Sequence, residues 1–213
     1  AAEKLLKEGY HPAVLNMASR QNPGGGVQTG AGAQEENLFR RTNLFQSLFQ
    51  FVPYAEKFGV HKSRFQYPLD RNYSGIYSPD ATIFRGTEQM GYPLLDNPFQ
   101  MSFIAVAGIN RPTLASPERI APELVEPVKN KMRTIFRIGL LHHHDSLVLG
   151  ALGCGAFRNP PAHIARLFHE VMEEEEFKNK YKLLVFAILD DHNARLKHNP
   201  DGNFLPFVRE FEI

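Results

Sequence analysis

The chain has 213 residues, with 24 Lys and Arg against 23 Asp and Glu, and therefore a net charge of +1. This balance excludes the broad basic surface of a protein that binds DNA, RNA or anionic membranes by electrostatics. The single cysteine, Cys154, excludes an internal disulfide and favours a reducing, intracellular compartment, cytoplasmic or nuclear. No apolar run approaches the ~20 residues that cross a bilayer, so no membrane partner is expected.

The first quarter of the chain is organised around a glycine loop. Residues 3–9 read as the end of a helix whose upstream residues were removed. A short apolar strand is expected at residues 13–17, and the glycine loop at residues 24–26 follows it. Apolar residues then recur every three or four positions, which predicts one helix from about residue 35 to residue 52, ended by Pro53.

The rest of the chain alternates between strands and helices. The expected strands are residues 74–77, 81–85, 101–107, 147–152 and 181–189. The expected helices are residues 122–141, 163–177 and a short one within 203–213, with a Pro-rich loop at 108–121. The acidic run at residues 173–176 opposes the helix dipole, so that helix end is expected to fray or lie open to solvent. This order predicts a single α/β domain over residues 1–213.

The glycine loop and the residues after it are the first candidate site. Gly24, Gly25 and Gly26 allow close approach to the backbone, and Gln34, Glu35 and Glu36 open the next helix. On a helical wheel, Gln34 and Glu35 point toward the interior or the mouth of a cleft, and Glu36 occupies the adjacent position on the wheel. Adjacent carboxylates in a dry cleft repel one another, so one can keep a proton and serve as a general acid. A simple turn with acids that complement the helix dipole remains the alternative, and residue types alone do not decide.

A second glycine loop is expected after the strand at 147–152. Its residues Gly153, Cys154, Gly155, Ala156 and Phe157 could cradle a diphosphate with backbone N–H groups, and Phe157 could stack on a ribose or base. A tight turn with a core phenylalanine is the alternative. Cys154 lacks a neighbouring base in sequence and is expected to be buried and inert.

Two further polar clusters are candidate sites. His142, His143 and His144 are consecutive and lack the spacing of metal ligands, so no metal site is predicted there, and they are expected to close a helix end. The turn that begins with Asp190 and continues through Asp191 and His192 is interpreted as the rim of a ligand site, with a solvated turn as the alternative.

The two loops carry a resemblance to a known family. Asn22-Pro23-Gly24-Gly25-Gly26, followed after seven residues by Gln34-Glu35-Glu36, resembles the signature of bacterial and fungal poly(ADP-ribose) glycohydrolases. The loop at residues 153–160 resembles that family's diphosphate-binding loop. The stretch from Tyr77 to Arg85 and the strand near Val106 are also in keeping with it. The two motifs occur in the right order, and together the resemblance spans roughly residues 13–195.

The resemblance implies a macrodomain-like fold with three α/β/α layers around a mixed central sheet, and hydrolysis of ribose–ribose O-glycosidic bonds. It makes Glu36 the general acid and later the base for water, while Glu35 holds ribose hydroxyls and Gln34 helps to position the substrate. The substrate-binding set comprises both glycine loops, Gln34 and Asp190, with Phe157 and Asp190 as the two candidates for the adenine partner. Its members are Gly24, Gly25, Gly26, Gln34, Gly153, Cys154, Gly155, Ala156, Phe157 and Asp190. It implies neither a metal nor a cofactor.

The same resemblance implies poly(ADP-ribose) and poly-ADP-ribosylated proteins as partners, in the response to DNA damage, without direct nucleic-acid binding. Nothing in the chain matches the accessory regions of the mammalian enzymes, and release of units from the polymer end is favoured over internal cleavage. Two alternatives stay open. One is a macrodomain that binds ADP-ribose without cleaving it, and the other is a hydrolase of mono-ADP-ribose or O-acetyl-ADP-ribose.

Overall fold

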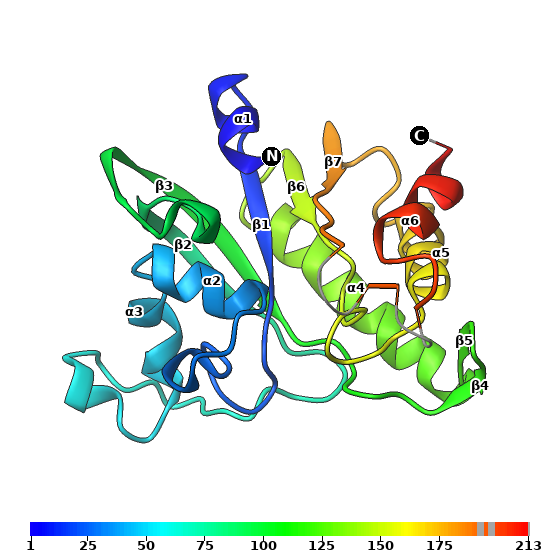
Figure 1. Ribbon diagram of the computed structural model, residues 1–213, viewed down its shortest axis with the longest axis horizontal. Helices are drawn as coiled ribbons and strands as arrows, with labels where there is room; N and C mark the ends of the chain where they lie inside the picture. The colour runs from blue at the N-terminus through cyan, green and yellow to red at the C-terminus, as the bar shows by residue number, and fades with distance from the viewer. Residues whose placement is uncertain (191–193, 196–198, 213) are drawn as a thin grey trace.

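The computed structural model describes residues 1–190, 194–195 and 199–212. Its centre is a five-stranded sheet in the order β2-β3-β1-β6-β7 (Figure 1). The bounds of these strands are β1 Pro12–Met17, β2 Ile76–Arg85, β3 Leu94–Val106, β6 Ser146–Leu149 and β7 Leu183–Phe186. Strands β3, β1, β6 and β7 run parallel to one another, and β2 is antiparallel to β3 at the edge. The predicted mixed sheet is confirmed.

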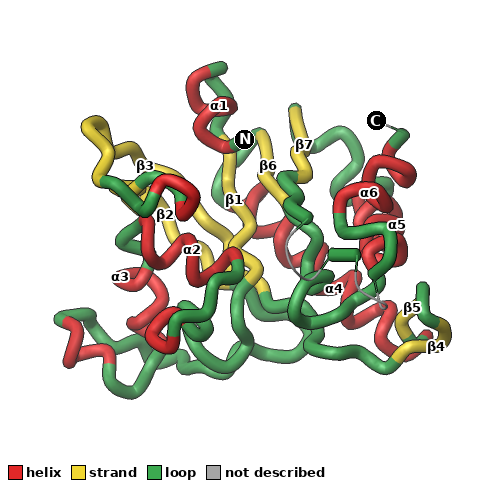
Figure 2. Tube along the Cα trace, viewed as in Figure 1, coloured by secondary structure: helices red, strands yellow, loops and turns green. Residues whose placement is uncertain are grey.

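Helices cover both faces of the sheet, so that the domain has three layers (Figures 1 and 2). Their bounds are α1 Ala2–Lys7, α2 Gln34–Arg41, α3 Phe45–Leu48, α4 Pro122–Leu141, α5 Pro161–Met172 and α6 Phe204–Phe211. The larger core lies between the sheet and α4, α5 and α6, and the smaller one lies between the sheet and α2 and α3. A two-stranded ribbon of β4 Leu114–Ser116 and β5 Arg119–Ile120 interrupts the predicted Pro-rich loop.

Strand β1 shows why the layers form on both sides. Ala13 and Leu15 belong to the core under α4 and α5, whereas Val14 packs into the core under α2 and α3. Alternate side chains of a strand point to opposite faces, so a central parallel strand needs apolar residues at nearly every position. Asn16 is the exception, since it is fully buried on the α2 side. A polar group at such a position needs a specific partner.

The long helix predicted for residues 35–52 is wrong, because the structure breaks it at Thr42. Thr42 is extended, with φ −135° and ψ 168°, and it forms a bridge with Ile83 of β2. Its hydroxyl donates to the carbonyl of Leu38 (2.9 Å) and accepts from the N–H of Leu44 (3.1 Å). These bonds satisfy backbone groups at the end of α2, so the chain can leave the helix and pair with β2.

Two other expectations are corrected by contacts between distant segments. The strands predicted at 74–77 and 81–85 are one strand, β2, with an irregularity between Ser78 and Ala81. The acidic run 173–176 does not end a helix, because α5 stops at Met172. Glu174 and Glu176 instead form bidentate pairs with Arg133 and Arg137 of α4, and these long-range pairs hold the run in place.

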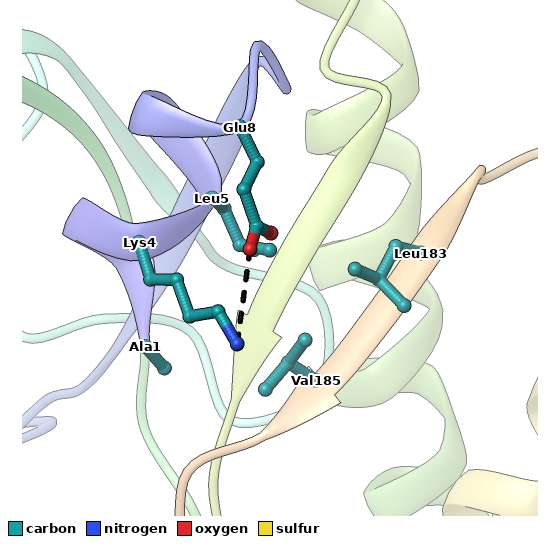
Figure 3. A pocket seen from close by; sticks show the side chains of 6 residues that line it. All are labelled: Ala1, Lys4, Leu5, Glu8, Leu183 and Val185. Atoms are coloured by element: carbon teal, nitrogen blue, oxygen red, sulfur yellow. Dashed lines mark ion pairs between the residues drawn. The ribbon is translucent and has the colours of Figure 1, made fainter.

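A shallow apolar hollow lies between α1 and β7 (Figure 3). It is lined by Ala1, Lys4, Leu5, Glu8, Leu183 and Val185, and its only drawn ion pair joins Lys4 to Glu8 across 3.7 Å. Leu183 pairs in register with Ser146, the first residue of β6, so this hollow lies toward the edge opposite the glycine loops. Among the described residues, no helix combines the length and apolar character needed to cross a membrane.

Candidate active site

The carboxyl ends of the parallel strands meet at one edge of the sheet. The N–H of Ala18, just after β1, donates to the carbonyl of Val106 at the end of β3 (3.1 Å). A methyl group placed on Gly108, after β3, would lie 3.1 Å from the Cα atom of Gly153, after β6. Loops from three strands therefore gather there, as open α/β sheets require for a ligand site.

Gln34 fixes the start of α2 to β1. Its Oε1 accepts from the N–H of Met17 (2.8 Å), and its Nε2 donates to the carbonyl of Leu15 (2.6 Å). The side chain thus pairs with the backbone of β1 as a neighbouring strand does. Gln34 was predicted to bind substrate, but these bonds give its amide a structural task, which is to place Glu35 and Glu36 beside the glycine loop.

Glu35 is almost completely buried, with 3% of its surface exposed. Its Oε2 accepts from the N–H of Ser19 (2.6 Å), and its Oε1 accepts from the N–H of Gly24 (3.0 Å). The amide Nδ2 of Asn16 lies 3.5 Å from the same Oε1. Burial, and to a smaller extent the charge of Glu36, raises the pKa of Glu35 to about 7, although the two backbone bonds act in the opposite direction.

Glu36 has one anchored oxygen and one free oxygen. Its Oε1 accepts from the N–H of Gly26 (2.8 Å). Only 7% of the surface of Glu36 is exposed. Its Oε2 is buried and has no hydrogen-bond partner in the described part of the chain. A carboxyl group that is held at one oxygen, with the other oxygen withheld from water, is arranged to give or take a proton.

The glycine triplet fits around these two carboxylates. Gly24 and Gly25 have φ values of +77° and +55°, which favour glycine. A methyl group on Gly25 would lie 2.2 Å from Oε1 of Glu36 and 3.3 Å from Oε2 of Glu35. The N–H groups of the triplet are all occupied within the chain, by Glu35, by the carbonyl of Asn22 and by Glu36. This loop therefore holds the acids, and those N–H groups are not free to bind the substrate, for which the triplet is a predicted contact.

The second loop has a different internal arrangement. Asn159 donates from Nδ2 to the carbonyls of Ile109 (2.7 Å) and Gly153 (2.9 Å), which joins the loop after β6 to the loop after β3. Within the described residues, the N–H groups of Gly155, Ala156 and Phe157 form no hydrogen bond. These N–H groups lie in the loop before α5, and neighbouring free backbone donors of this kind can bind an anion. Asn159 was not singled out from the sequence.

Cys154 and Phe157 differ in accessibility. Cys154 is fully buried, and burial raises the pKa of its thiol, so it can contact a ligand only through its backbone. Phe157 is partly buried, and its carbonyl accepts from the N–H of Arg111 (2.8 Å). Its ring remains a candidate for stacking.

Asp190 has a structural partner at the start of α6. Its Oδ1 accepts from the N–H groups of Asn203 (2.6 Å) and Phe204 (3.1 Å), so it caps that helix. A contact with adenine stays a prediction. Asp191 and His192, which were interpreted as part of the same rim, lie outside the described residues.

The consecutive histidines follow the last turn of α4. His144 is buried, its Nδ1 lies 3.0 Å from the carbonyl of His11, and its Nε2 lies 2.9 Å from the hydroxyl of Tyr77. Burial lowers the pKa of His144, which favours the neutral ring. Among the described residues no group of three or more His, Cys, Asp or Glu side chains is placed to hold a metal ion.

Three residues near the acids were not identified from the sequence. Ser19 acts through its backbone N–H, which no sequence pattern marks. Asn16 could have been noticed as a polar residue in an apolar strand, and its Oδ1 is buried without a partner. Tyr67 lies in a stretch whose structure the sequence did not predict, and its hydroxyl is also buried without a partner among the described residues.

Comparison with known proteins identifies the family of the chain. The family model "Microbial-type PARG, catalytic domain" matches residues 1–86, which contain the glycine loop and both acids. A point mutant of poly(ADP-ribose) glycohydrolase from Thermomonospora curvata is 32% identical, with a TM-score of 0.77, over 99% of this chain and 74% of that one. A comparison with curated protein sequences finds no significant match.

A second bacterial enzyme gives the same result. The poly(ADP-ribose) glycohydrolase from Deinococcus radiodurans, in complex with ADP-ribose, is 32% identical, with a TM-score of 0.72, over 99% of this chain and 79% of that one. The T. curvata enzyme has also been solved with the inhibitor ADP-HPD. Identity at this level over nearly the whole chain extends beyond the fold, and the predicted macrodomain-like architecture is confirmed. The chain belongs to the poly(ADP-ribose) glycohydrolase family, in its microbial form.

Proposed function

We propose that this chain is a poly(ADP-ribose) glycohydrolase that cleaves ribose–ribose O-glycosidic bonds and releases ADP-ribose by acid–base catalysis. The observation that carries the mechanism is the carboxyl group of Glu36, which is fixed by Gly26 through Oε1 and is buried and unpartnered at Oε2. That free oxygen is the atom that would face the scissile bond. Family membership supports the reaction, and the geometry supports the assignment of the acid.

In the first step, Glu36 donates its proton from Oε2 to the glycosidic oxygen. The bond between that oxygen and the anomeric carbon then breaks, and the electron pair leaves with the oxygen. Water attacks the resulting oxocarbenium-like carbon and gives its proton to the Glu36 carboxylate, which restores the acid. Glu35, held by Ser19 and Gly24, would bind hydroxyls of the distal ribose.

In this proposal the second glycine loop binds the diphosphate. The N–H groups of Gly155, Ala156 and Phe157 have no partner among the described residues, whereas those of the triplet at 24–26 are occupied. Neighbouring backbone N–H groups that are free in a loop can stabilise an anion. The bound diphosphate would also add negative charge near the acids, which favours a protonated carboxyl group.

The partners proposed for the chain are poly(ADP-ribose) and proteins that carry it, inside the cell and without direct nucleic-acid binding, in keeping with the net charge of +1. Cleavage from the polymer end is the preferred mode. A single domain over residues 1–213 is sufficient to hold the acids and both glycine loops.

The test is release of ADP-ribose from purified poly(ADP-ribose) by the wild type and by Glu36→Gln. Glutamine can still accept from Gly26 but cannot donate a proton as an acid, so the rate should fall by about 100-fold or more. Glu123→Gln, an exposed residue in the first turn of α4, is the matched control and should keep the wild-type rate.

The same assay separates the alternatives. A wild type that binds ADP-ribose but leaves the polymer intact would be a reader, and the proposed mechanism would be wrong. Preferential cleavage of mono-ADP-ribosylated protein or O-acetyl-ADP-ribose over polymer would place the chain among the other hydrolases. Products longer than one unit at early times would contradict cleavage from the end.

A further inference from the structure

Three buried polar atoms lack a partner in the described part of the chain. They are Oδ1 of Asn16, Oε2 of Glu36 and the hydroxyl oxygen of Tyr67. Such groups are rare in folded proteins, because each loses its hydrogen bond to water without gaining another. All three relate to the same carboxyl pair. Asn16 contacts Glu35 through Nδ2 at 3.5 Å, and the charge of Glu35 acts on Tyr67.

Tyr67 reaches the acids from a different part of the chain. Its own N–H donates to the carbonyl of Phe51 (2.9 Å), and the N–H of Leu69 donates to the carbonyl of Arg20 (2.9 Å). Arg20 follows Ser19, whose N–H binds Glu35. The segment at residues 67–69 is therefore fixed by backbone bonds against the loop that leaves β1, so the place of the Tyr67 ring does not depend on its hydroxyl.

The chemistry of the orphan atoms restricts what can bind them. Asn16 Oδ1 can only accept a hydrogen bond. Burial, together with the nearby charge of Glu35, raises the pKa of Tyr67, so its hydroxyl stays protonated and can donate. A ligand that satisfies both must offer one donor and one acceptor. A sugar hydroxyl does so with one group, because its oxygen accepts while its hydrogen is donated.

We propose that Tyr67 and Asn16 are specificity-determining residues that recognise a hydroxyl of the distal ribose beside Glu35. Tyr67 donates to the oxygen of that hydroxyl, the hydrogen of the same hydroxyl is donated to Oδ1 of Asn16, and Glu35 accepts from the neighbouring hydroxyl. This inference rests on the proposed function and adds to it a reason for selecting ribose over deoxyribose. A site whose buried polar groups need a hydroxyl rejects the analogue that lacks it, because those groups then remain unpaired.

A purely structural role for the hydroxyl does not explain the arrangement. A tyrosine that only fills space gains nothing from a buried, unpartnered hydroxyl, and phenylalanine would serve better. The replacement Tyr67→Phe removes one atom and breaks no hydrogen bond formed by the side chain in this structure. The variant is therefore expected to fold as the wild type does, with an unchanged or slightly higher urea midpoint.

The experiment measures binding by titration calorimetry, with ADP-ribose and with two analogues whose distal ribose lacks either the 2-hydroxyl or the 3-hydroxyl. Tyr67→Phe should weaken ADP-ribose binding about 3- to 10-fold, the range for one lost hydrogen bond. For one of the two deoxy analogues, wild type and variant should bind equally, because the bond no longer exists to be lost. Tyr54→Phe, an exposed tyrosine before the segment, is the matched control and should change nothing.

Other outcomes overturn the inference. An equal loss for all three ligands would assign Tyr67 a structural role, and unchanged binding of ADP-ribose by Tyr67→Phe would exclude the hydrogen bond. A wild type that binds the deoxy analogues as tightly as ADP-ribose would remove the proposed selectivity while leaving the glycohydrolase function intact. A wild type that binds none of the ligands would contradict the proposed function itself.

Discussion

Replacing Gly25 with alanine should abolish most catalysis while leaving the protein folded. The new methyl carbon would lie 2.2 Å from Oε1 of Glu36, whereas real contacts of a Cβ atom stay beyond 3.0 Å. The carboxyl group must therefore retreat by roughly 1 Å, and a misplacement of that size can cost about 100-fold in rate. The retreat also strains the 2.8 Å bond from the N–H of Gly26.

Gly30→Ala provides the control for backbone strain. Gly30 lies four residues after the glycine triplet and has a φ of +85°, yet a methyl group there would meet no atom within 4 Å. Both alanine variants place an L-residue in the left-handed region, at a cost of about 1–2 kcal/mol each. Only Gly25→Ala adds the clash with Glu36.

The assay combines turnover of poly(ADP-ribose) with urea unfolding for both variants. Gly30→Ala should lose stability but keep its kcat within a few-fold of the wild type, and Gly25→Ala should lose about 100-fold or more in kcat. If the two variants show the same kcat, the proposed fit between the glycine loop and Glu36 is wrong.

Two further predictions concern stability. Burial raises the pKa of Glu35 from 4.5 to about 7, so the folded state binds this proton more tightly than the unfolded chain does. As the pH rises from about 4.5 to 7, the free energy of unfolding should therefore fall by up to about 3 kcal/mol. Urea unfolding at pH 5 and pH 8 checks this, and Glu35→Gln should reduce the difference; an unchanged difference contradicts the assignment. Asp190→Ala should cost about 1 kcal/mol through loss of the cap on α6, whereas Asp190→Asn should retain most of it, as urea midpoints would show. A loss of ADP-ribose affinity in Asp190→Asn without a stability change would instead favour the adenine contact.

Local patterns in the sequence predicted the elements that depend on neighbouring residues. Pro122 and the apolar stripe after it predicted a helix over 122–141, and α4 has those bounds. Apolar runs separated by loops predicted the strands of the central sheet. The ends of β1, β6 and β7 differ from the predicted ends by at most three residues, whereas β3 begins at Leu94, seven residues before its predicted start. These features depend on periodicity and on proline geometry, which the sequence contains directly.

Features that depend on distant contacts could not be predicted. The break at Thr42 requires β2 as a partner, and the acidic run at 173–176 is held by Arg133 and Arg137 of another helix. The segment that carries Tyr67 is fixed by backbone bonds from Tyr67 to Phe51 and from Leu69 to Arg20. No local pattern marks these pairs, because each depends on how separate segments pack in the folded chain.

The two glycine loops have different tasks, although both look like ligand cradles in the sequence. The helix N-terminus and two backbone donors all favour an ionised Glu35, yet burial outweighs them and raises its pKa to about 7. The first loop therefore donates its N–H groups to carboxylates that would otherwise lack hydrogen bonds in a buried site. A loop whose donors are already bonded has none left for phosphate, and the proposed mechanism therefore assigns the diphosphate to the second loop. Substitutions at Gly25 should then act mainly on kcat, whereas substitutions that disturb Asn159 and the loop it holds should act mainly on substrate affinity.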